Sequence, residues 1–108
     1  MEALQVAQHI ERIILALVKE GKRSTELINS KAEAAKAYDE EIGLCSAAHK
    51  ASGVAIGMIS SQAKKDAAQK LYDKIIAEET LKAHYSRIEL LKAQLNGYQS
   101  IYKHLEVT

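Results

Sequence analysis

The chain has 108 residues, with 15 Lys and Arg against 14 Asp and Glu, and it contains no Pro, Phe or Trp. This length corresponds to one domain, residues 1–108, and a net charge of +1 argues against binding DNA mainly through charge. Ala, Leu, Ile, Glu, Lys and Gln dominate the composition. Most of these residues favour helices, so we expect an all-α protein.

The cysteine content and the N-terminus bear on the compartment. Cys45 is the single cysteine, which rules out a disulfide within the chain and favours a reducing environment. Glu2, Glu11 and Arg12 interrupt the apolar N-terminal segment, which therefore resembles neither a secretory signal nor a membrane span. We expect a cytoplasmic protein without membrane contact.

The first helix is expected over residues 2–20, where apolar residues recur at three- and four-residue spacing and form one wide stripe. Gly21 follows, and glycine is typical of the position just past a helix end. We therefore expect a break there, with Ser24 or Thr25 able to cap a second helix over residues 24–52. In the alternative reading Gly21 is only a kink, and residues 2–51 form one rod.

The connection and the last helix come next. Gly53 lies where a left-handed residue ends a helix, and apolar residues after it predict a short helical turn at 56–63 that covers the end of the hairpin. Asp66 is expected to open a last helix over residues 66–106. The predicted fold is thus an elongated antiparallel helical hairpin with an additional N-terminal helix.

Two stretches of coiled-coil spacing predict an oligomer. The second helix approaches a heptad repeat, and the last helix alternates steps of four and three residues near its C-terminal half. Together the apolar stripes exceed what one narrow hairpin can bury. We therefore predict a dimer or larger bundle, with an oligomer seam at Tyr38, Ile42, Cys45, Ile88, Leu91 and Leu95.

Motifs that would indicate catalysis are weak. Cys45 and His49 are four residues apart on one helical face, which is half a zinc site at most, and packing explains both residues. Adjacent glutamates occur on both long helices, but the Glu-x-x-His pattern of dimetal bundles does not. The glycine-containing connection lacks the Gly-Lys-Ser/Thr of a phosphate loop. We predict no enzyme and no catalytic, cofactor-binding or metal-binding residues.

A few residues can contact a ligand or partner. They comprise a basic run before the last helix, a polar gap in its apolar stripe and two tyrosines one turn apart near its end. The candidates are Lys64, Lys65, Glu78, His84, Tyr98 and Tyr102.

The order of several short segments resembles a known group of proteins. These segments are Ala37-Tyr38-Asp39-Glu40-Glu41-Ile42-Gly43-Leu44, Lys50-Ala51-Ser52-Gly53, Ala63-Lys64, Ile76-Ala77-Glu78, Lys92-Ala93-Gln94-Leu95 and Tyr98-Gln99-Ser100-Ile101. Over residues 30–105 the chain resembles small all-helical proteins of unassigned function from the early recombination and replication regions of tailed bacteriophages. The resemblance implies a phage or prophage origin and a role in the host cytoplasm, and it assigns no functional residue.

We expect from this a non-enzymatic binding protein that contacts host defence or replication–recombination proteins. One alternative is an oligomer that sequesters small nucleotide signals between subunits, using the tyrosines, the lysines and the polar gap. A second is an accessory binder of single-stranded nucleic acid, which the near-neutral charge disfavours.

Overall fold

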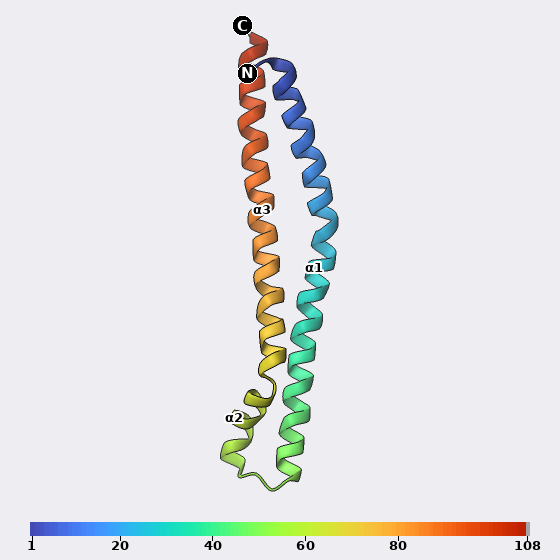
Figure 1. Cartoon of the computed structure of the whole chain (residues 1–108), viewed down its shortest axis with the longest axis vertical. Coiled ribbons are helices and arrows are strands. Elements are labelled where there is room, and N and C mark those ends of the chain that lie inside the picture. The colour runs from blue at the N-terminus through green and yellow to red at the C-terminus, as the bar shows by residue number, and fades with distance from the viewer. Residues whose placement is uncertain (108) are drawn as a thin grey trace. The chain divides into compact units, whose positions relative to one another are not determined.

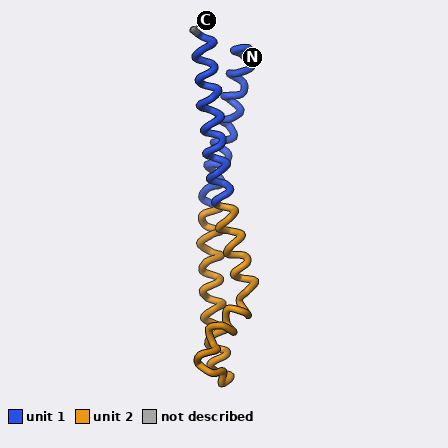
Figure 2. The backbone as a smooth tube through the Cα atoms, turned by 90° about the vertical axis from the view of Figure 1, so that its left-hand side faces the viewer, with its two compact units in different colours: residues 1–26, 82–108 blue, residues 27–81 orange. Residues whose placement is uncertain are grey.

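The computed structural model describes residues 1–107, which form three helices: α1 (Ala3–Ala51), α2 (Ile56–Asp66) and α3 (Ala68–Val107) (Figure 1). No strand occurs in this described range. The all-α prediction is therefore confirmed. The described chain divides into two compact units, residues 1–26 with 82–108 as unit 1, and residues 27–81 as unit 2 (Figure 2).

The predicted break at Gly21 is wrong, because α1 continues through it. The separate N-terminal helix of the prediction is therefore the first half of α1. A helical glycine costs only about 1 kcal/mol relative to alanine. That cost is offset here because the residues on either side, Glu20 and Ser24, both contact His84 on α3. Ser24 is consequently an interior residue of α1 and not a helix cap.

The end of α1 follows the predicted chemistry. Gly53 adopts a positive φ of 81°, its N–H donates to the carbonyl of Lys50 at 3.2 Å, and the N–H of Val54 donates to the carbonyl of His49 at 3.0 Å. These two bonds form the Schellman motif, which ends a helix by satisfying its last carbonyls. Glycine is favoured at this position because a Cβ is strained at positive φ.

Unit 2 contains the second half of α1, helix α2 and the start of α3. The short helix predicted at 56–63 is present as α2 and extends to Asp66, which closes α2 instead of opening α3. Ala63 and Ala67, one turn apart at the junction, are fully buried. Small side chains at these positions let the backbones of this unit approach closely.

Unit 1 is a pair of antiparallel helix segments from the two ends of the chain, lying side by side (Figures 1 and 2). On α1, buried or half-buried residues alternate at spacings of four and three, which is the pattern of a helix packed against one neighbour. These inner residues are Val6, Ile10, Ile13, Leu17, Glu20 and Ser24. Two of the three that are fully buried are aliphatic, and the third is a glutamate.

Candidate functional site

The most unusual feature of unit 1 is a buried ionic cluster between its two helices. Glu20 on α1 is 3% exposed and His84 on α3 is 5% exposed. The His84 Nδ1 atom lies 3.0 Å from Oε2 of Glu20. Two arginines also reach this carboxylate, Arg87 with Nε 3.2 Å from Oε1 and Arg23 with a guanidinium nitrogen 3.8 Å from Oε2. A buried carboxylate needs such partners, because an unpaired charge is costly to remove from water.

Ser24 completes the cluster on the other side of the imidazole. Its Oγ atom lies 2.7 Å from His84 Nε2 and 3.4 Å from the carbonyl oxygen of Glu20. A hydroxyl both donates and accepts, so it can donate to a neutral Nε2, or accept from a protonated one while donating to the carbonyl. The cluster is therefore satisfied in both protonation states of His84. Within the described residues, no buried side-chain nitrogen or oxygen lacks a partner.

The order of Ser24, His84 and Glu20 matches that of a nucleophile, its base and an orienting acid. The surroundings favour a structural role for it. Ser24 lies inside a continuous helix, where its backbone N–H belongs to the helix ladder. Glu20 is shared with two guanidinium groups, and neither groove described below is lined by any of the three residues. We interpret the cluster as a contact that sets which turn of α1 faces which turn of α3.

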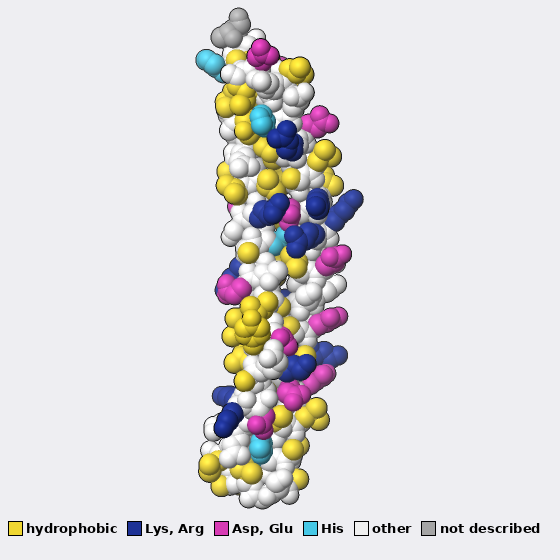
Figure 3. All heavy atoms as spheres, in the orientation of Figure 1, with side chains coloured by type: hydrophobic (Ala, Val, Ile, Leu, Met, Phe, Trp, Pro, Cys, Tyr) yellow, Lys and Arg dark blue, Asp and Glu magenta, His cyan; other side chains and the backbone are white. Residues whose placement is uncertain are grey.

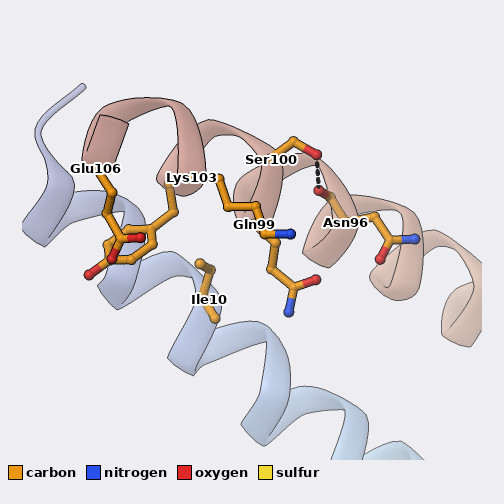
Figure 4. Close-up of a pocket in the computed structure, with 7 residues that line it drawn as sticks. Ile10, Asn96, Gln99, Ser100, Lys103 and Glu106 are labelled. Carbon is orange, nitrogen blue, oxygen red and sulfur yellow. Dashed lines mark hydrogen bonds between the residues drawn. The ribbon is translucent and has the colours of Figure 1, made fainter. Parts of the chain in front are cut away.

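A groove of about 520 Å³ lies between the helices of unit 1 towards the chain ends. Ile10 contributes from α1, and the remaining lining comes from α3, namely Asn96, Gln99, Ser100, Tyr102, Lys103 and Glu106 (Figure 4). The Ser100 hydroxyl is occupied within its own helix, where it donates to the Asn96 carbonyl at 3.0 Å. Two amides and one charge of each sign share the lining with the Ile10 and Tyr102 side chains, so this open groove is of mixed polarity.

A second, more apolar groove of about 400 Å³ also lies in unit 1. Its lining is Met1, Gln94, Gly97, Tyr98 and Ile101. A Cβ added at Gly97 would meet nothing within 4 Å, so glycine leaves this surface hollow. The ring of Tyr98 is stacked on His9 of α1, with centroids 4.9 Å apart and planes 9° from parallel. Tyr98 therefore already has one ring face covered by its own chain.

The predicted contact residues fall into two separate groups. Lys64 and Lys65 are exposed on α2 in unit 2, where Glu78 is half-buried on α3. The other three, His84, Tyr98 and Tyr102, belong to unit 1, and each is at least half-buried there. The lysines and the tyrosines thus belong to different units of one chain, and their role in binding a ligand stays a prediction.

The six predicted seam residues are all half-buried within their own units. In unit 2, the ammonium of Lys74 lies 5.1 Å from the centre of the Tyr38 ring, so that ring already has a cationic neighbour. In unit 1, Ile88, Leu91 and Leu95 follow the buried His84 by four, seven and eleven residues, which places them on the same face of α3. Their role in an oligomer stays a prediction.

Cys45 and His49 have separate partners. The Cys45 thiol donates to a carboxylate oxygen of Glu41 at 3.6 Å, while His49 Nε2 lies 2.6 Å from Oδ2 of Asp66. Burial raises the pKa of the Cys45 thiol from its ordinary value of 9.0, and the hydrogen bond and charge of Glu41, with the charge of Asp66, raise it further. This favours an inert thiol. Nowhere in residues 1–107 do three His, Cys, Asp or Glu side chains gather as a metal site needs.

Sequence reasoning missed the ionic cluster. His84 lies 60 residues after Ser24 and 64 after Glu20, and nothing in the local sequence shows that it meets them. One signal was available, since Glu20 and Ser24 continue the four-and-three spacing of Val6, Ile10 and Ile13 through the expected break. A polar residue that keeps the period of an apolar stripe indicates a buried polar contact.

The fold and these sites define a class: an all-α chain of paired helices with a small apolar core, one buried ionic cluster and shallow surface grooves. Comparison with known protein families, curated protein sequences and solved structures finds no match. Across the described helices, none combines the length and apolar character needed to cross a membrane.

Proposed function

We propose that this chain is a non-enzymatic binding protein that acts through protein–protein contacts along its helix surfaces and self-associates. The observation that carries this proposal is the distribution of apolar residues. Among the described residues, five hydrophobic side chains are buried, whereas sixteen large ones are exposed. Single exposed apolar residues are ordinary, but contiguous groups of them mark interaction surfaces.

One such group lies at the start of α3 in unit 2. Leu71, Tyr72, Ile75 and Ile76 are 37%, 60%, 46% and 48% exposed and occupy adjacent turns. Figure 3 shows hydrophobic side chains gathered over this part of α3. The surface matches the apolar face of an amphipathic helix, because side chains at such spacings form ridges that fit the grooves of a second helix. If the chain is phage-encoded, such a helix would belong to a host defence or replication–recombination protein.

The test is site-specific photocrosslinking in cells, with a photoreactive phenylalanine analogue in place of Tyr72. The matched control carries the analogue at Leu44, which is also strongly exposed but lies on α1, apart from this group. A discrete adduct with another protein at position 72, absent at 44 and lost in Ile75→Glu/Ile76→Glu, supports the proposal. A folded chain that sediments as a monomer and gives no adduct at 72 contradicts it.

A further inference from the structure

The exposed face of α1 in unit 1 carries a second coiled-coil seam. We define this outer seam as residues 4, 7, 11, 14, 18, 21 and 25, which alternate steps of three and four throughout. Its members are Leu4, Ala7, Glu11, Ile14, Val18, Gly21 and Thr25. This is the rhythm of a helix that packs against a neighbour. The covered inner residues of α1 have the same rhythm but lie on a different face, so α1 is patterned for two neighbouring helices.

Every member of the outer seam except the half-buried Ala7 is exposed. Leu4, Ile14 and Val18 are 68%, 46% and 52% exposed, and Leu15 beside them is 64% exposed. A Cβ added at Gly21 would meet nothing within 4 Å. Four large aliphatic side chains on one helix face are thus left in water, in a unit that fully buries only two aliphatic side chains of its own.

From residue 7 to residue 25 the positions of the outer seam are symmetric about residue 16, as two identical helices packed antiparallel require. We propose that the outer seam docks antiparallel against the outer seam of a second copy of the chain, with the two-fold axis at the level of residue 16. The facing positions are then those whose numbers sum to 32, which pairs 14 with 18, 11 with 21 and 7 with 25. An isologous interface requires this reciprocity, since residue i must meet j while j meets i.

The sizes of the side chains fit this antiparallel pairing. Ile14 and Val18 meet twice at the centre, which gives an aliphatic core across the axis. The long Glu11 faces Gly21 of the other copy, where no side chain competes for space.

Charge also favours the antiparallel direction. Glu11 is the one charged member of the seam, and the structure gives it no ion-pair partner in the described chain. The antiparallel pairing places Glu11 next to Lys22 of the other copy, because Lys22 flanks the Gly21 that Glu11 faces. A parallel pair would instead place the two Glu11 carboxylates opposite each other, where like charges destabilise the contact.

The size of the seam sets the expected affinity. With its exposed flanking residues Gln8, Leu15 and Lys22, the seam contributes ten residues a side. A standard specific interface uses about 20–30 residues a side. We therefore expect a dimer with a dissociation constant in the micromolar range.

Sedimentation of the full chain from about 1 to 300 µM tests the association. A concentration-dependent shift from 11.9 kDa towards twice that mass is expected. Val18→Glu should weaken association at least tenfold. Leu90→Glu, at a position 59% exposed on α3 and outside the seam, should leave it unchanged. Circular dichroism at 222 nm confirms that both variants remain helical.

Charge reversal tests whether the two copies of α1 pair in the antiparallel orientation. Glu11→Lys should weaken association about fivefold, since it creates two like-charge pairs of about 0.5 kcal/mol each. Adding Lys22→Glu to the same chain should restore the original affinity. If the double variant is no tighter than Glu11→Lys alone, the proposed pairing of the two residues is wrong.

Disulfide trapping in a Cys45→Ala background tests the register. A mixture of the Ala7→Cys and Thr25→Cys chains should form a cross-linked dimer on mild oxidation, whereas either variant alone should not. Cross-linking of Ala7→Cys alone indicates a parallel pair and overturns the proposal, as does a monomer at every concentration.

The inference rests on the proposed function, because it assigns one exposed face to a second copy. The proposed function and the self-docking of α1 can fail separately. A strict monomer that still gives the adduct at position 72 overturns the self-docking of α1 and the self-association, and leaves the proposed contact with another protein in place. A strict monomer without that adduct contradicts both.

Discussion

Replacing Glu20 by alanine is the most direct test of the buried ionic cluster in unit 1. The carboxylate contacts His84, Arg87 and Arg23 at 3.0, 3.2 and 3.8 Å. Leaving a buried hydrogen-bonding group such as the His84 ring without its partner costs about 1–3 kcal/mol. Here the side chains of Arg87 and Arg23 are 62% and 49% exposed, so both can return to water at little cost. The loss is therefore concentrated at the His84 side chain, which is 2% exposed.

We expect Glu20→Ala to lower the free energy of unfolding by about 1–3 kcal/mol, out of the roughly 5–15 kcal/mol of a typical domain. The assay is urea unfolding followed by circular dichroism at 222 nm, at one protein concentration for all variants. Arg87→Ala is the matched control and should cost at most about 1 kcal/mol, because the arginine is largely solvated.

The double variant Glu20→Leu/His84→Leu separates the cost of an unpaired group from the net contribution of the pair. Replacing a buried ion pair by apolar side chains of similar volume is often neutral or stabilising. We therefore expect this variant to be at least as stable as the original chain. A loss below about 1 kcal/mol in Glu20→Ala would refute the reasoning, and so would a double variant as unstable as that single one.

Three further predictions concern unit 2 and the glycines. Gly53→Ala should destabilise the chain by about 1–2 kcal/mol in urea unfolding because of its positive φ, whereas Gly97→Ala, in an open helical position, should stabilise it by up to about 1 kcal/mol. Equal changes in stability for the two glycine variants would contradict the role of Gly53 in ending α1. Cys45 should react with iodoacetamide more slowly than free cysteine at pH 8, because its raised pKa keeps the thiol protonated, and its rate should still be rising at pH 9.0, because its pKa lies above that value. Glu41→Gln should speed that reaction, and an unchanged rate would remove the role given to Glu41. Asp66→Ala should cost less than about 1 kcal/mol, since the aspartate side chain is 49% exposed, and a larger loss in urea would show that its contact with His49 is more than a surface pair.

Much of the fold follows from local pattern. The absence of proline, the helix-forming composition and the three- and four-residue spacing predict long helices without reference to tertiary contacts. The end of α1 at Gly53 was equally predictable, because a left-handed residue after a helix selects glycine. The same rule failed at Gly21, which shows that glycine only permits a helix end.

The candidate sites were much less predictable than the helices. The predicted contact residues were chosen by chemical type, and the structure distributes them over two units. His84 is one of the residues predicted to contact a ligand or partner, yet it is among the most buried of the described residues. Whether a polar residue in an apolar stripe is buried or exposed depends on the side chains that face it from the neighbouring helix. Helical spacing alone carries no information about those side chains.

The sequence by itself determines that this protein is helical, where its connection lies and that its apolar residues exceed what a narrow helix pair can cover. These properties depend on backbone preference and on the period of side chains along one helix, both of which are local. Only the tertiary structure decided that α1 runs through Gly21, that Glu20 and Ser24 meet His84, and that Leu4, Ile14 and Val18 stay exposed. A helix has several faces of similar composition, and the choice among them is made by the partner helix that contacts one of them.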